Sequence, residues 1–112
     1  MIIHGRYIPA IQRKAEGDSF VISDVTHIHR DQVGRLDLRC IVIVYGLLSP
    51  VVVYMYPNAI AFIVENGSWN SHGVVMASSK NIPCIVSVGA HIYEIPDNVS
   101  LKILCPDGQI NF

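Results

Sequence analysis

The chain of 112 residues has the length of one small domain. Its 8 basic and 9 acidic residues give a formal net charge of -1, which argues against a protein that binds nucleic acid by neutralising phosphates. Apolar residues make up 51% and charged residues 15%, so the chain can build a core and is not of the disordered class. The sequence contains neither GxxxxGK(S/T) nor GxGxxG, which argues against nucleotide binding through those loops.

The first part of the chain is dominated by predicted β-structure. Apolar stretches at 2–8 and 19–23 predict two strands, and Glu16-Gly17-Asp18 between them predicts a turn. Residues 24–39 form the most polar stretch, for which we expect a solvated loop or irregular structure. The continuous apolar run at 41–45 predicts a strand buried on both faces, as in a parallel sheet.

The second part alternates strands with helices. Further apolar, β-branched stretches predict strands at 59–64, 84–88 and 99–105. Ser49-Pro50 is typical of an N-cap followed by proline at the first helical position, and predicts a short helix over 51–56. Asn70-Ser71 can cap a second helix over 72–80, which Pro83 keeps from continuing. This alternation predicts an α/β domain with crossover connections.

Residues 40–64 contain no Asp, Glu, Lys or Arg, and this segment is long enough for a membrane-spanning helix. Pro50 and Pro57 lie within it, and each would break the helical hydrogen-bond ladder. Its two ends are also rich in β-branched residues, which favour strands. We therefore expect two strands flanking a short helix, and no membrane span.

The cysteines, Cys40, Cys84 and Cys105, are odd in number and lie far apart in apolar runs. A small secreted domain normally carries a denser, even set. We expect these thiols to be buried and reduced, and the N-terminus shows no run typical of a signal peptide. Both features favour the cytoplasm. Met1 and a Pro-Asp-Gly turn at 106–108 favour a complete small protein.

The strongest chemical signal lies within residues 66–88. His72 stands at the predicted start of a helix among small residues that permit close approach of another molecule. Backbone N–H groups at a helix start favour an anion. A neutral imidazole nitrogen is a nucleophile, and the same N–H groups would stabilise a phosphoryl group that it accepts. Many helices begin near a histidine, so an ordinary surface histidine is the alternative on these grounds.

This stretch resembles the phosphohistidine signature of the phosphoenolpyruvate-utilising enzymes, such as pyruvate phosphate dikinase, phosphoenolpyruvate synthase and the first enzyme of the sugar phosphotransferase system. Ser71-His72, four small or apolar residues and then the 81–86 sequence NIPCIV are similar to the family's TSHAAIVAR and GIPAVVG motifs. The similarity covers Cys40 to the C-terminus and is loose over the first 39 residues. Ser78 stands where the family has the arginine of its Ala-Arg pair.

The resemblance implies the family's mobile, swivelling domain, a single three-layer β/β/α unit over residues 1–112. It implies that His72 is the catalytic, phosphorylated residue, and we expect Asn70, Ser71 and the backbone of Gly73 to bind the phosphate. We expect no cofactor and no metal. The chain would be a phosphotransferase component that works without a domain of its own for nucleotide or phosphoenolpyruvate. The partners implied are an ATP-grasp-like nucleotide-binding subunit, a phosphoenolpyruvate-binding subunit or an acceptor subunit.

Three features leave alternatives open. Ser78 in place of the arginine removes a bidentate phosphate clamp or an interdomain contact, and favours a non-catalytic binding or regulatory module with the same fold. His27 and His29 form a pair that a strand would place on one face for a metal, although no further ligands follow at typical spacing. Trp69 is equally compatible with covering the site, binding a partner or anchoring the core.

Overall fold

The computed structural model describes all residues except 1, 9–13, 23–38, 69 and 105–107. The strands are β1 (Ile2–His4), β2 (Arg6–Ile8), β3 (Lys14–Ile22), β4 (Ile41–Val44), β5 (Ala61–Val64), β6 (Cys84–Val86), β7 (Ser100–Leu104) and β8 (Gln109–Asn111). The helices are α2 (Pro50–Met55), α3 (His72–Ser79) and the 3-10 helix η2 (Gly89–Glu94).

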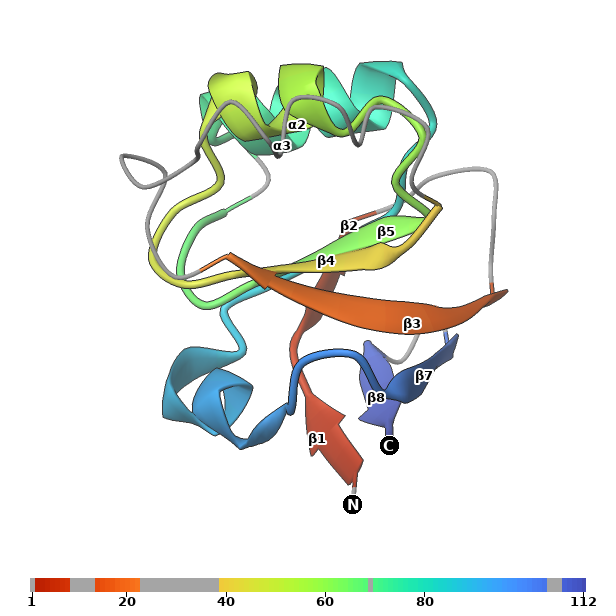
Figure 1. The fold of residues 1–112 in the computed structure, drawn as a ribbon. Helices are drawn as coiled ribbons and strands as arrows, with labels where there is room; N and C mark the ends of the chain where they lie inside the picture. The colour runs from red at the N-terminus through yellow and green to blue at the C-terminus, as the bar shows by residue number, and fades with distance from the viewer. Residues whose placement is uncertain (1, 9–13, 23–38, 69, 105–107) are drawn as a thin grey trace.

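These elements form three layers, which confirms the predicted β/β/α architecture (Figure 1). The strand order is β1-β8-β7-β3-β4-β5-β6-β2. Strands β3, β4, β5 and β6 pair in parallel, and β2 joins β6 antiparallel at the edge. The helices α2 and α3 cover one face of this parallel sheet, and β1, β7, β8 and η2 lie on the other side.

The central strands are buried on both faces, as their unbroken apolar sequence predicts. Alternate side chains of each strand face opposite layers. In β4, Val42 and Val44 belong to the core beneath the helices, and Ile41 and Ile43 belong to the core shared with the antiparallel strands. The same alternation continues along β5 and β6, so the parallel sheet contributes side chains to both cores.

The turn predicted at 16–18 is wrong, because strand β3 continues through these residues. Residues Lys14–Asp18 pair antiparallel with β7, and Ser19–Ile22 pair in parallel with β4. The chain therefore stays extended through Glu16-Gly17-Asp18, because both halves gain ladder hydrogen bonds from different neighbours. The local Gly-Asp sequence is a turn signal that long-range pairing overrides.

The predicted strand over 2–8 is divided at Gly5. Strand β1 pairs with β8, and β2 pairs with β6, so the chain passes from one sheet to the other at this glycine. A Cβ atom at Gly5 would lie 2.5 Å from the Ile85 Cγ2 atom and 2.8 Å from the Val86 carbonyl oxygen. The crossing therefore requires a residue without a side chain.

The two helices begin where the sequence predicts. Ser49 caps α2, with its hydroxyl accepting from the Val51 N–H at 3.2 Å, and Pro50 is the first helical residue. Helix α3 ends before Lys80, and Asn81 follows with a positive φ of 60°. The sequence did not predict η2 or β8. The loop expected at 24–39 lies outside the described residues, apart from Arg39.

Among the described residues, no helix has the length and apolar character needed to cross a membrane. The apolar segment 40–64 is divided among β4, α2 and β5, as the two prolines predict.

Candidate functional site

The parallel strands β4, β5 and β6 bring their carboxyl ends to one edge of the sheet, where α2 and α3 begin (Figure 1). The loop from β5 to α3 spans residues 65–71 and delivers His72 as the first residue of α3. Ligand sites of open α/β sheets lie at this edge, outside the carboxyl ends of the strands. The topology thus places His72 where the fold commonly holds its chemistry.

The His72 side chain is exposed and stands at a pocket of about 390 Å³. Two segments of the chain line this pocket, one following β4 and one preceding α3. The lining residues are Leu47, Leu48, Pro50, Asn70, Ser71 and His72. An exposed imidazole beside a hollow can meet a group carried by another molecule, which a core histidine could not do.

Asn70 and Ser71 also line the pocket, and their side chains shape the loop that leads to His72. The Ser71 hydroxyl accepts from the Ser68 N–H at 3.1 Å and makes no capping bond to α3, although Ser71 is the N-cap residue. The Asn70 side-chain oxygen accepts from the Ser68 hydroxyl. Both polar groups therefore have partners within the chain, and their predicted binding of phosphate stays a prediction.

Gly73 lies one residue beyond His72 and is buried. A Cβ atom at this position would lie 2.1 Å from the Leu48 carbonyl oxygen, closer than any packed carbon and oxygen can approach. The close neighbour of this small residue is thus the Leu48 backbone of the same chain. Gly73 lets the start of α3 pack against the segment after β4, which includes Leu48 of the pocket lining.

Sequence reasoning did not identify Glu65, the residue that follows β5. Its carboxylate accepts from the Gly46 N–H at 2.8 Å, and the Tyr93 hydroxyl donates to its two oxygens at 2.8 and 2.9 Å. This hydrogen bond raises the pKa of Tyr93, because a proton donated to a carboxylate is held more tightly. The available signal was the lone acidic residue directly after an apolar strand.

The comparison with known families decides the assignment. The family model described as "PEP-utilising enzyme, mobile domain", where PEP is phosphoenolpyruvate, matches residues 38–107. The chain belongs to this family. Mobile domains of the family are phosphohistidine carriers in phosphotransferases and work with other domains or subunits. The predicted family resemblance is therefore confirmed over most of the chain.

Solved structures with a similar fold include three proteins. A chain of holo-form aconitase X from Thermococcus kodakaraensis has a TM-score of 0.69 and 20% identity, covering 99% of this mobile domain and 97% of that chain. A UPF0107 protein has a TM-score of 0.68 and 17% identity, covering 100% of this domain and 98% of that chain. Enzyme I has a TM-score of 0.57 and 21% identity, covering 70% of this domain and 32% of that chain. No curated protein sequence matches the chain significantly.

Ser78, which replaces the arginine expected in this family, is half-buried on α3. Trp69 and the His27/His29 pair lie outside the described residues. Within the part of the chain that the structure does describe, no three His, Cys, Asp or Glu side chains gather as a metal site would require. Cys40 and Cys84 are buried, as predicted, and Cys105 lies outside the described residues.

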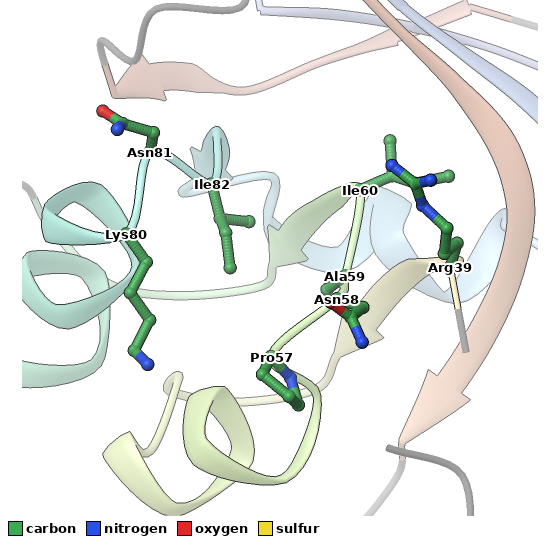
Figure 2. A pocket seen from close by; sticks show the side chains of 8 residues that line it. All are labelled: Arg39, Pro57, Asn58, Ala59, Ile60, Lys80, Asn81 and Ile82. Carbon is green, nitrogen blue, oxygen red and sulfur yellow. The ribbon is translucent and has the colours of Figure 1, made fainter. Parts of the chain in front are cut away.

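A second pocket of the mobile domain, of about 230 Å³, lies at the opposite ends of the same strands (Figure 2). It is lined by Arg39, Pro57, Asn58, Ala59, Ile60, Lys80, Asn81 and Ile82. Arg39 and Lys80 stand on opposite sides of it. Lys80 is the C-cap residue of α3, where a cation offsets the negative end of the helix dipole. This pocket is separate from the His72 site.

Proposed function

We propose that the chain is a cytoplasmic, stand-alone phosphohistidine carrier in which His72 accepts a phosphoryl group and passes it to an acceptor. One observation carries the proposal: the exposed imidazole of His72 opens α3 at the carboxyl edge of the parallel sheet, within the segment that the family model matches. Family membership supports the chemistry, and the exposed position supports access by a partner.

The proposed phosphoryl transfer to His72 is an in-line displacement at phosphorus. One imidazole nitrogen of His72 forms a bond to phosphorus, the bond from phosphorus to the donor's leaving atom breaks, and its electron pair leaves with the donor. The ring then releases its proton to water. Backbone N–H groups in the first turn of α3 and the side chains of Asn70 and Ser71 would hold the phosphoryl oxygens. Transfer to the acceptor runs the same step in reverse.

The partners in this proposal are a subunit that binds nucleotide or phosphoenolpyruvate and a subunit that holds the acceptor. Phosphoryl transfer depends mostly on positioning and charge stabilisation, which the partner sites would supply. A carrier that acts as a separate polypeptide must bind its partners directly, because it lacks the high effective concentration that a linker provides.

A small phosphoryl donor tests the nucleophile without any partner. The purified chain is incubated with phosphoramidate, and intact mass and phosphorus NMR follow the gain of an acid-labile, base-stable phosphoryl group. The phosphoryl group that the wild type gains most rapidly should be absent from His72→Gln. His91→Gln is the matched control, since His91 is also an exposed histidine, within the short helix η2. Equal rates for His72→Gln and the wild type would contradict the proposal.

Transfer from a biological donor tests the carrier role. The chain is incubated in an extract of its source organism with radiolabelled phosphoenolpyruvate or ATP, then purified under alkaline conditions. We expect label on the wild type and on His91→Gln, and none on His72→Gln. An unlabelled wild type with both donors would overturn the carrier role.

A non-catalytic binding or regulatory module is the second candidate function. Ser78 in place of the family's arginine favours it, because a serine cannot form the bidentate contacts that a guanidinium makes with phosphate. The likeness to aconitase X, at 20% identity over nearly the whole chain, shows the fold alone, and a shared fold does not by itself establish carrier chemistry. The two labelling experiments separate the two functions.

A further inference from the structure

The Glu65 carboxylate joins three segments that are far apart in the sequence. It follows β5 directly, accepts from the Gly46 N–H in the segment after β4, and receives the Tyr93 hydroxyl from η2. Hydrogen bonds to an ionised carboxylate are about twice as strong as those between neutral groups. A single side chain thus fixes three segments at the edge of the sheet where His72 lies.

Two of these segments are the walls of the His72 pocket. One wall follows β4 and includes Leu47 and Leu48. The other consists of residues 70–72, at the end of the loop that begins with Glu65 and at the start of α3. Backbone bonds already align the walls at their base, from the Glu65 N–H to the Val44 carbonyl at 3.0 Å and from the Asn66 N–H to the Gly46 carbonyl at 2.9 Å. The bond from Gly46 to the carboxylate adds a side-chain tie between them.

The third segment keeps the carboxylate in place. Tyr93 packs on Tyr45 with ring centroids 4.6 Å apart, so its hydroxyl approaches Glu65 from a ring that is itself held. The Gly89 N–H donates to the Glu65 carbonyl at 3.0 Å, which anchors the start of η2 at the same residue. Without the Tyr93 hydroxyl, the Glu65 side chain would gain freedom to leave the Gly46 N–H.

We propose that Glu65 and Tyr93 are positioning residues for His72, because their hydrogen bonds fix the distance between the two walls of the pocket in which the imidazole is phosphorylated. This inference rests on the proposed carrier function. Neither residue lines the pocket, so each acts through the segments that it joins. Phosphoryl transfer is sensitive to such a device because small displacements of a reacting group lower the rate steeply.

The rate of phosphoramidate labelling at His72 tests this proposal. Glu65→Ala removes the tie and should slow labelling about tenfold, and Tyr93→Phe should slow it about threefold because the ring stack remains. Glu65→Gln should restore most of the rate, since an amide oxygen still accepts from Gly46 and Tyr93. Tyr54→Phe is the matched control, because Tyr54 is 76% exposed and its hydroxyl makes no hydrogen bond to a described residue.

A second measurement separates positioning from loss of stability. Amide exchange of Gly46 should be faster in Glu65→Ala and Tyr93→Phe, because its acceptor is lost or loosened. Ser19→Ala, a destabilising change outside the pocket, should leave the labelling rate of the folded protein unchanged. Wild-type rates in both tie variants would overturn the positioning role. A wild type that takes no phosphoryl group at His72 would instead overturn the carrier function on which the role rests.

Discussion

Gly73 shows that a small residue beside a candidate nucleophile can serve packing. A glycine within a helix normally lowers stability, so its replacement by alanine usually stabilises by about 0.5–1 kcal/mol. Here the added Cβ atom would lie 2.1 Å from the Leu48 carbonyl oxygen, and backbone would have to move. We expect Gly73→Ala to lower the free energy of unfolding by about 2 kcal/mol or more, measured by urea denaturation.

Ser78→Ala provides the control on the same helix, where the side chain is half-buried. We expect its free energy of unfolding to stay within about 0.5 kcal/mol of the wild type. Should Gly73→Ala prove as stable as Ser78→Ala, the close packing of α3 on the segment after β4 would be wrong.

The buried thiol of Cys84 is expected to make the free energy of unfolding depend on pH. Burial raises the pKa of its thiol from an ordinary value of 9.0 to about 12, since a thiolate is costly in an apolar core. Between these values the unfolded chain loses the proton and the folded chain keeps it, so stability falls as pH rises. The loss from this one residue approaches about 1.4 kcal/mol per pH unit.

Cys84→Ala should remove that part of the pH dependence. Urea denaturation of the variant and the wild type is compared below and above pH 9, the ordinary thiol value. The variant is expected to be less stable at neutral pH, because it leaves a small cavity, but to lose less stability in alkaline solution. Parallel curves for the two proteins would show that the Cys84 thiolate is not the group responsible.

At the scale of the element, α2 depends on its cap. The helix has six residues and three valines, which are poor helix formers, and it contains no acidic residue in its first turn. Its start relies on the Ser49 hydroxyl and on Pro50. Ser49→Ala should lower the free energy of unfolding by about 1 kcal/mol, and Ser49→Asp should retain the wild-type value because a carboxylate also accepts from the Val51 N–H. Equal losses in both variants would argue against a capping role.

The elements that the sequence predicts correctly are those with local causes. Ser49-Pro50 starts α2, and unbroken apolar runs form the central strands, because capping and burial act over a few residues. Strand β3 was missed at Gly17 and β8 was missed entirely, because both depend on partners far along the chain. Long-range pairing of this kind leaves little trace in a local sequence pattern.

The candidate site likewise combines features with local causes and features that depend on distant segments of the chain. His72 and its position at the start of α3 follow from a motif and a cap signal that are contiguous in the sequence. The Glu65–Tyr93 contact joins residues 28 positions apart through the packing of η2, an element that the sequence did not predict. The contact between Gly73 and Leu48 likewise requires the placement of α3 against the segment after β4, which only the folded chain defines.

At the scale of the whole molecule, the two cores are coupled through shared strands. The parallel sheet contributes alternate residues of β4, β5 and β6 to both cores, and β3 belongs to both sheets. Neither layer can lose its strands without exposing apolar surface of the other. The fold is therefore expected to open as one cooperative unit.

Ser19 lies at the point where β3 passes from one sheet to the other, and it tests this coupling. Its side chain is 3% exposed, its hydroxyl donates to the Pro96 carbonyl at 2.7 Å, and the hydroxyl oxygen accepts from the Val99 N–H at 3.0 Å. Ser19→Ala should cost about 1–3 kcal/mol, because two backbone groups lose their side-chain partner. Amide exchange should then accelerate equally at Ile43 in the parallel sheet and at Ile103 in the antiparallel strands. The control is Ser100→Ala, at an exposed position of β7, which should change neither exchange rate. Acceleration confined to Ile103 would mean that the antiparallel layer opens separately, and the shared strand would then fail to bind the two sheets into one unit.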